Sequence, residues 1–345
     1  MMKRIVKLVV RLWLWLALFV LHAPRRVEHA LRKVLGLGGG GAVHEGTSNR
    51  ARPAELDDPV YGEHVTSRRG LHYVKAGDDD APVALMLHGF PEFWFGWRKQ
   101  IVALKEQYQT VAVDMRGYNL SVKPTDVSAY GIDALVSDVA TFIEEELAGR
   151  KVVLVAHDWG GVVAWFFAYA HPELIDRLVI LNAPHPRSFV VNADWAQIKM
   201  SWYIGFFQLP YLPELLLSQR NYKGVTGAFT SRTMGYQKRD ELNDAHLDAY
   251  RYAVSHPGAL ESMINYYRQI LAVPSPRLRE ALRAPLQIPV LIIWGTEDKA
   301  LGTQLLAGIE RYVKDVRIEL IDGASHWVQV DAADRVNELI LGFAS

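Results

Sequence analysis

Short apolar runs alternate with amphipathic stretches through much of the chain. The runs 83–88, 110–114 and 152–156 are predominantly apolar, which predicts strands buried on both faces. Between them, the stretches 97–107 and 132–147 carry apolar residues at helical spacing. Buried strands that alternate with helices predict a largely parallel sheet with right-handed crossovers, flanked by helices.

The same rhythm extends on both sides of this region. A hairpin is expected around Arg69 and Gly70, and three strands and two helices are expected later in the chain. The hairpin strands are predicted at 60–67 and 71–77, the later strands at 177–182, 290–295 and 317–321, and the later helices at 303–312 and 328–343.

The pattern changes between residues 186 and 285. This stretch is rich in Trp, Tyr, Phe and Pro, indicates several short helices, and contains no run typical of a buried strand. We therefore expect one α/β domain, in two parts at 59–185 and 286–345, with a helical cap at 186–285 inserted after the sixth strand. Residues 1–58 would form an N-terminal membrane anchor and linker.

Composition excludes several function classes. The 38 Lys and Arg balance the 38 Asp and Glu, so nothing indicates a nucleic-acid partner. The chain of 345 residues has no cysteine, which excludes thiol catalysis and disulfides. Half of the residues are apolar, which is enough for a large core.

The N-terminus has the character of a membrane segment. Residues 1–11 are basic and apolar, and an uninterrupted apolar run follows at 12–21, without a convincing cleavage site after it. We interpret it as a single-pass or interfacial anchor, joined to the domain by the glycine-rich stretch 36–41. The protein would then be membrane-associated, at the endoplasmic reticulum (microsomal) if it is eukaryotic. A cleaved signal peptide is the alternative.

The predicted strand 152–156 ends in an unusual turn. Ala156 and Gly160 stand two residues before and two residues after Asp158, which is the spacing of a nucleophile elbow. Small residues are needed there because the strand end and the helix start approach closely. An alternative role for Asp158 is to cap the following helix.

Two further residues complete a candidate catalytic triad. Asp158, Asp298 and His326 each follow a predicted strand, in the order nucleophile, acid, histidine. Functional side chains gather at the carboxyl ends of parallel strands, so the three are expected to meet. Taken singly, Asp298 would suit a turn and His326 a structural role.

The segment from His88 to Glu92 follows the predicted strand 83–88, where an elbow requires half of an oxyanion hole. We expect the backbone N–H groups of Phe90 and Trp159 to form that hole. Pro91 would fix the turn, with a cis bond as one form. His88, Pro91 and Trp159 are expected to contribute to substrate binding.

An aspartate nucleophile selects its electrophile. Carboxylate attack on an ester gives a labile anhydride, whereas attack on saturated carbon gives a stable alkyl ester. The substrate would therefore be an epoxide or an alkyl halide. His326, oriented by Asp298, would activate the water that hydrolyses the ester of Asp158, without a metal or cofactor.

These residues resemble the epoxide hydrolases of the α/β-hydrolase superfamily, and the N-terminus resembles their membrane-anchored animal branch. The matching motifs are His88-Gly-Phe-Pro-Glu92, Asp114-Met-Arg-Gly-Tyr118 with Ser121, His157-Asp-Trp-Gly-Gly161, Asn182-Ala-Pro-His-Pro186, Trp294-Gly-Thr-Glu-Asp298 and Gly323-Ala-Ser-His326. One departure is Asn119-Leu120, where the family more often has small residues.

The resemblance implies two cap tyrosines that protonate the epoxide oxygen. Tyr203 matches the first and Tyr267 the second, while Tyr266 and Tyr222 are rival assignments. Aromatic packing is the alternative role for each tyrosine.

We therefore predict an epoxide hydrolase that takes a small lipophilic epoxide and water. A haloalkane dehalogenase with the same nucleophile is the first alternative, but Phe90 stands where those enzymes commonly carry a halide-binding asparagine. The second is a non-catalytic ligand-binding protein of the same fold.

Overall fold

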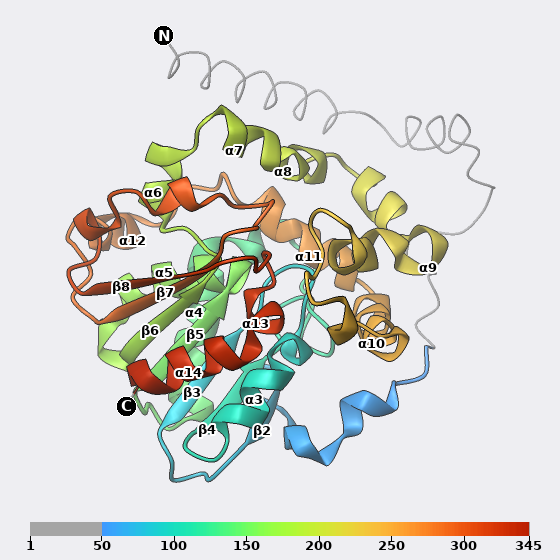
Figure 1. The fold of residues 1–345 in the computed structure, drawn as a ribbon, viewed down its shortest axis with the longest axis horizontal. Coiled ribbons are helices and arrows are strands. Elements are labelled where there is room, and N and C mark those ends of the chain that lie inside the picture. The colour runs from blue at the N-terminus through green and yellow to red at the C-terminus, as the bar shows by residue number, and fades with distance from the viewer. Residues whose placement is uncertain (1–49, 345) are drawn as a thin grey trace.

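We describe residues 50–344 of the protein in a computed structural model, which contains one mixed eight-stranded sheet between layers of helices (Figure 1). The strand order is β1-β2-β4-β3-β5-β6-β7-β8. Both pairings of β2 are antiparallel, and the strands from β4 to β8 pair in parallel. The bounds are β1 (Glu63–Thr66), β2 (His72–Ala76), β3 (Val83–Leu87), β4 (Gln109–Val113), β5 (Val152–His157), β6 (Ile175–Leu181), β7 (Val290–Gly295) and β8 (Val316–Ile321).

The apolar runs are continuous because both faces of the central strands are covered. Along β3, Leu85 enters one core cluster and Met86 enters the other, as the alternation of a strand requires. The first cluster lies under α4 (Ile132–Glu146) and α5 (Asp158–Ala170), behind the sheet in Figure 1. The second lies under α3 (Arg98–Leu104) and α14 (Ala333–Ala344), in front of it.

Two of the predicted helices were wrong in detail. The stretch 303–312 forms two 3-10 turns, Thr303–Leu306 and Ile309–Arg311, instead of one α-helix. Gly308 separates them in a left-handed conformation, with φ at 72°, and this ends the helical hydrogen bonding. The stretch 328–343 is divided at Ala332 into α13 (Val328–Asp331) and α14.

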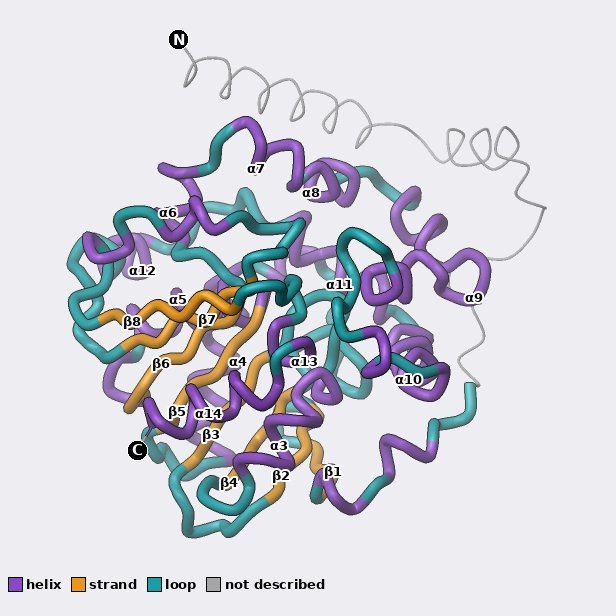
Figure 2. The backbone as a smooth tube through the Cα atoms, viewed as in Figure 1, coloured by secondary structure: helices purple, strands orange, loops and turns teal. Residues whose placement is uncertain are grey.

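The connection between β6 and β7 consists of short helices joined by loops, and within this described stretch no strand is assigned. Figure 2 shows them as a run of short purple segments, which from α6 to α10 follows the upper and right edges of the molecule, while α11 lies further inside. They are α6 (Pro186–Asn192), α7 (Trp195–Met200), α8 (Trp202–Phe207), α9 (Leu212–Thr230), α10 (Asp244–Ser255), α11 (Ala259–Arg268) and α12 (Pro276–Ala281). We keep the name cap for residues 186–285.

The predicted membrane anchor falls almost entirely on residues 1–49, which lie outside the described part of the chain, so it stays a prediction. Among residues 50–344, no helix combines the length and the apolar character that a membrane span requires.

Candidate active site

Asp158 stands at a strained turn between β5 and α5. It is the first residue of α5 and has a φ of 48°, in the left-handed region that non-glycine residues rarely adopt. A side chain at Gly160 would place its Cβ 2.2 Å from the carbonyl oxygen of Leu87, and one at Gly161 would lie 2.4 Å from the Cβ of Ala183. The small residues of the motif are therefore required by close packing of the elbow against β3 and the segment after β6.

The two carboxylate oxygens of Asp158 have different surroundings. Oδ1 accepts a hydrogen bond of 2.8 Å from the backbone N–H of Phe90, while Oδ2 lies 3.6 Å from Nε2 of His326. The loop that carries Phe90 can come this close because Gly89 has no side chain. A Cβ at that position would lie only 2.4 Å from the Cβ of Asp158. The peptide bond between Phe90 and Pro91 is cis. One oxygen is thus fixed by the loop, and the other is directed to the histidine.

His326 is held from behind by Asp298. Nδ1 of the ring lies 2.8 Å from Oδ2 of Asp298, whose Oδ1 accepts the backbone N–H groups of Ala300 and Leu301 at 2.7 and 2.9 Å. The side-chain amide of Asn182 also donates to Oδ2 of Asp298, at 2.7 Å. The structure therefore brings all three predicted triad residues together.

Asn182 was not among the predicted site residues. It follows β6 with a φ of 42°, and its amide oxygen accepts the backbone N–H of Gly295 at 3.2 Å. It consequently ties the end of β6 to the loop of Asp298. The Asn-Ala-Pro-His motif marks the position in the sequence, but only the folded structure shows what the amide contacts.

Charge is distributed unevenly over the triad. Burial disfavours the charged imidazole, but the carboxylates of Asp298 and Asp158 outweigh this and raise the pKa of His326 to about 10. Burial would likewise raise the pKa of Asp158, but its contacts with His326 and with the Phe90 N–H lower that pKa below its ordinary value. At neutral pH the resting site therefore holds an ionised Asp158 beside a protonated His326.

A second buried pair, Glu92 and His157, lies next to His326, and sequence reasoning missed it. Nε2 of His157 donates to the carbonyl oxygen of His326 at 2.9 Å, and Nδ1 lies 3.0 Å from Oε2 of Glu92. Gln329 also donates to both oxygens of Glu92. His157 therefore joins the backbone of His326 to the buried side chain of Glu92.

His88 has a structural setting. Its side chain is fully buried, Nδ1 donates to the carbonyl oxygen of Gly89 at 2.9 Å, and Nε2 accepts the backbone N–H of Met115 at 3.0 Å. Burial lowers the pKa of His88, which keeps the ring neutral as these two contacts require. Both nitrogens are thus engaged in fixing the loop that carries Phe90.

The two predicted cap tyrosines come from different helices and contact each other. Tyr203 of α8 and Tyr267 of α11 have ring centroids 5.8 Å apart, and the Tyr267 ring lies edge-on to Trp159 and Phe90 at 5.1 and 5.2 Å. Burial, followed by the negative charge of Asp158, raises the pKa of both phenols. Both remain protonated at neutral pH, and both lie within reach of the charge on Asp158.

The rival tyrosines are placed differently. The hydroxyl of Tyr266 donates to the backbone carbonyl of Arg116 at 2.7 Å and is therefore already used. Tyr222 lies at the kink of α9 with a φ of 58°, and lines a separate cavity of about 280 Å³ in which no triad residue takes part.

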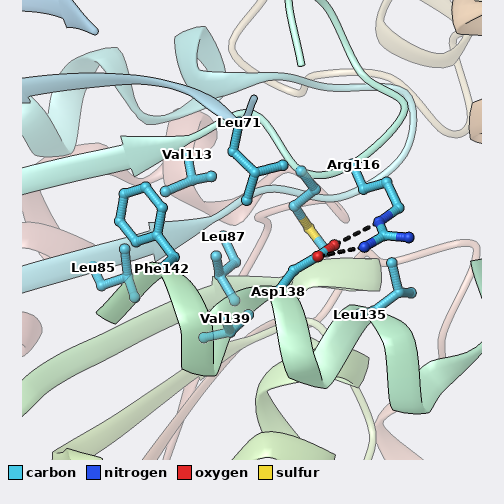
Figure 3. Close-up of a pocket in the computed structure, with 10 residues that line it drawn as sticks. Leu71, Leu85, Leu87, Val113, Arg116, Leu135, Asp138, Val139 and Phe142 are labelled. Atoms are coloured by element: carbon cyan, nitrogen blue, oxygen red, sulfur yellow. Dashed lines mark hydrogen bonds and ion pairs between the residues drawn. The ribbon is translucent and has the colours of Figure 1, made fainter. Parts of the chain in front are cut away.

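Arg116 connects α11 to the core. Its guanidinium forms an ion pair with Asp138 of α4, in which Nε donates to Oδ2 at 2.7 Å, and it also donates to the carbonyl of Ala129 at 3.0 Å. Figure 3 shows this pair at the edge of a small apolar cavity of about 20 Å³ between the sheet and α4. These contacts hold Arg116 in place. Its carbonyl accepts the hydroxyl of Tyr266, the neighbour of Tyr267, and so links α11 to the core.

Comparisons with known proteins give matches over most of the chain. Residues 82–333 match the family described as alpha/beta hydrolase fold. Epoxide hydrolase 1 of Caenorhabditis elegans is 42% identical over 276 residues, which cover 79% of this chain and 67% of that protein. Epoxide hydrolase 4 of Homo sapiens is 37% identical over 325 residues, covering 91% and 88%. A solved Bacillus megaterium epoxide hydrolase in complex with an inhibitor is 33% identical with a TM-score of 0.73, covering 82% and 99%.

Proposed function

The chain belongs to the epoxide hydrolases of the α/β-hydrolase superfamily, and from this membership we propose that it converts lipophilic epoxides to vicinal diols through an ester on Asp158. One observation carries the proposal: the Asp158 carboxylate lies beside a backbone N–H donor and a histidine backed by a second aspartate, and its charge acts on two phenols that contact each other.

Ring opening forms the ester. Oδ2 of Asp158 attacks an epoxide carbon, because Oδ1 is occupied by the Phe90 N–H, and the carbon–oxygen bond of the ring breaks. The oxygen that leaves takes a proton from Tyr203 or Tyr267. A positioned acid contributes roughly 10²–10⁴-fold to such a step.

Esterification then changes His326 from an acid to a base. The ester of Asp158 carries no negative charge, so one of the two carboxylates that raise the pKa of His326 is removed. The imidazole of His326 then releases its proton to the tyrosinate that was formed when the epoxide oxygen was protonated. His326 is then neutral and hydrogen-bonded to Asp298, as a general base requires.

Hydrolysis regenerates the resting site. His326 removes a proton from water, and the hydroxide adds to the carboxyl carbon of Asp158 while Oδ1 becomes an oxyanion that faces the Phe90 N–H. When the intermediate collapses, the diol oxygen leaves and takes the proton of the new Asp158 carboxyl group. Asp158 is again ionised and His326 is again protonated.

Trapping the ester tests the proposal. In His326→Gln the first step remains possible, whereas the base for the second step is missing. Intact-mass spectrometry after mixing with an epoxide should show an adduct equal in mass to the epoxide, and Asp158→Asn in the same background should show none. An unmodified His326→Gln protein after complete consumption of the epoxide would contradict the mechanism.

The dehalogenase alternative has less support. The Phe90 side chain packs edge-on against Phe207 and Tyr267, and offers no amide to a halide. Release of halide from haloalkanes, without diol formation from epoxides, would favour that alternative. Ligand binding without turnover of any epoxide would favour a non-catalytic role.

We also propose that the N-terminus attaches the protein to a membrane. The support is the sequence alone: the apolar run 12–21 and its basic flanks. Fractionation of full-length protein should place it with membranes in the presence of high salt.

A further inference from the structure

Two tryptophans of the cap are exposed, in contrast to the other tryptophans of the described chain. Trp195 and Trp202 are 50% and 61% exposed, whereas the remaining described tryptophans are at most 7% exposed. Val190 and Val191, immediately before them in the chain, are 81% and 59% exposed. We call these four side chains the outer cap surface. They lie on the consecutive helices α6, α7 and α8, and exposed apolar side chains that gather in one region mark interaction sites.

The three helices that carry this surface follow one another along a single edge of the molecule. Figure 1 shows α6, α7 and α8 in a row at the top of the view, far from α3. Their other sides are fixed to the core: Gln197 of α7 donates to the carbonyl of Ala300 at 2.8 Å and accepts the N–H of Gly302 at 2.9 Å. Phe207 of α8 is buried against Tyr267. Because α7 and α8 are fixed in this way, they cannot rotate to bury the side chains of the outer cap surface.

The charges on these helices favour an anionic partner. The guanidinium of Arg187 turns to the core, where it donates to the Leu282 carbonyl at 3.0 Å and lies over the Tyr312 ring, whereas Lys199 is exposed with its Nζ atom 5.8 Å from the ring centroid of Trp195. The one acidic side chain, Asp194, accepts the backbone N–H of Gln197 as the cap of α7. Exposed apolar side chains and indoles beside an exposed lysine have the composition that binds the headgroup region of a lipid bilayer.

We propose that the outer cap surface docks on a lipid bilayer, with Trp195 and Trp202 in the interfacial region. Tryptophan is enriched at that depth because its ring is apolar and its N–H is polar. The chain before Arg50 also fits this occupant, since it contains the apolar run 12–21. The intervening residues 22–49 can span up to about 90 Å when extended, which allows both segments to reach one membrane.

If this surface docks on a bilayer, the substrate would reach the site from the bilayer. Trp202 faces outward and the next residue, Tyr203, lies beside Tyr267 at the site. If the surface docks, α8 lies between Asp158 and a lipophilic epoxide dissolved in the bilayer. This consequence rests on the proposed function, whereas the docking itself is tested without turnover.

The absence of cysteine makes a direct test simple. Single-cysteine variants Val191→Cys and Trp202→Cys of the full chain are labelled with a fluorophore sensitive to polarity, and Val102→Cys on α3, 39% exposed, is the matched control. Each protein is reconstituted at one chain per nanodisc, with mixed neutral and anionic lipids. We expect the emission at positions 191 and 202 to shift to shorter wavelength and to be quenched by brominated lipids, with no change at 102.

Three outcomes would overturn the docking. Probes at 191 and 202 that report water, as the one at 102 does, would show that the surface is free. Shifts that appear only when several chains share a vesicle would identify a second copy of the chain as the occupant. Equal shifts at all three positions would show general adsorption.

A kinetic measurement tests substrate delivery separately. Trp195→Ser with Trp202→Ser should raise KM severalfold for a long-chain epoxide presented in vesicles, and leave kcat/KM for a short water-soluble epoxide unchanged. Equal KM values for the vesicle substrate would refute delivery. If neither wild type nor variant hydrolyses any epoxide, the proposed function fails while the probe result stands.

Discussion

The two halves of the active site are held by different kinds of contact. On the core side, Asp158 and Asp298 are fixed by backbone N–H groups at 2.7–2.9 Å and by a strained turn. On the cap side, Tyr203 and Tyr267 are positioned by neighbouring rings at 5.1–5.8 Å. The two carboxylates are thus held by directional bonds, whereas the two tyrosines that we propose as acids are held mainly by packing against other rings.

We expect the largest effect on rate from replacing the two tyrosines on the cap side. Tyr203→Phe combined with Tyr267→Phe keeps the ring packing and removes both acids, so ester formation should slow by about 10²–10⁴-fold. Single replacements should cost less, because each phenol covers for the other. Rapid-mixing measurement of the adduct in the His326→Gln background isolates this step, and an unchanged rate in the double variant would refute both assignments.

On the core side, we expect a substitution to act by disturbing the packing of the elbow, and so to lower stability. Gly160→Ala places a Cβ 2.2 Å from the Leu87 carbonyl, which is backbone and cannot rotate away, so we expect a loss of about 2–3 kcal/mol in unfolding free energy. Gly227→Ala in α9 is the matched control, since its Cβ would meet nothing within 4 Å and alanine favours a helix by up to about 1 kcal/mol. Urea unfolding of both variants checks this, and equal stabilities would show that the elbow tolerates side chains.

The coupling between nucleophile and base predicts a pH effect. Asp158→Asn imitates the uncharged ester and should lower the pKa of His326 from about 10 by about one unit or more, as followed by NMR titration of the imidazole. The sign follows from linkage: a histidine with a raised pKa stabilises the folded state below about pH 6.5, and this contribution is lost as the pH rises through 10. An unchanged or raised pKa in Asp158→Asn would remove the physical basis for the switch of His326 from acid to base.

The smallest effect concerns the contact that joins the two sides. Tyr266→Phe removes the 2.7 Å hydrogen bond to the Arg116 carbonyl, worth about 1 kcal/mol, without touching Tyr267. If this bond positions α11, kcat should fall severalfold with KM nearly constant, and the pH profile should keep its shape. A loss of stability with unchanged kcat would limit Tyr266 to a structural role.

The same contrast explains what the sequence could predict. The parallel strands were recognisable because burial on both faces leaves continuous apolar runs, as in β3 and β5. The meeting of Asp158, Asp298 and His326 could be predicted because each follows a strand of one parallel sheet, although β8, the strand before His326, is an edge strand that is not buried on both faces. By contrast, the 303–312 helix was wrong because Gly308 takes a left-handed conformation, which apolar spacing does not reveal.

Partners far apart in the chain were out of reach of sequence reasoning. Glu92 and His157 form one pair across 65 positions, and Arg116 and Tyr266 another across 150. Each residue taken alone resembles an ordinary surface or core residue, and its partner is chosen by the fold. Tyr266 illustrates the consequence, because its bond to Arg116 and the contacts of Tyr267 with Tyr203 and Phe90 distinguish the two neighbours only in the folded structure.

The central claim is that Asp158 itself is esterified and then hydrolysed at its own carboxyl carbon. A single turnover in ¹⁸O-labelled water, with excess enzyme over epoxide, followed by mass spectrometry of the peptide that contains Asp158, tests this directly. The mechanism predicts that the heavy isotope enters the Asp158 carboxylate and is missing from the diol of the first turnover. Label in the diol with an unlabelled Asp158 would show that water attacks the epoxide directly, and would contradict the covalent mechanism.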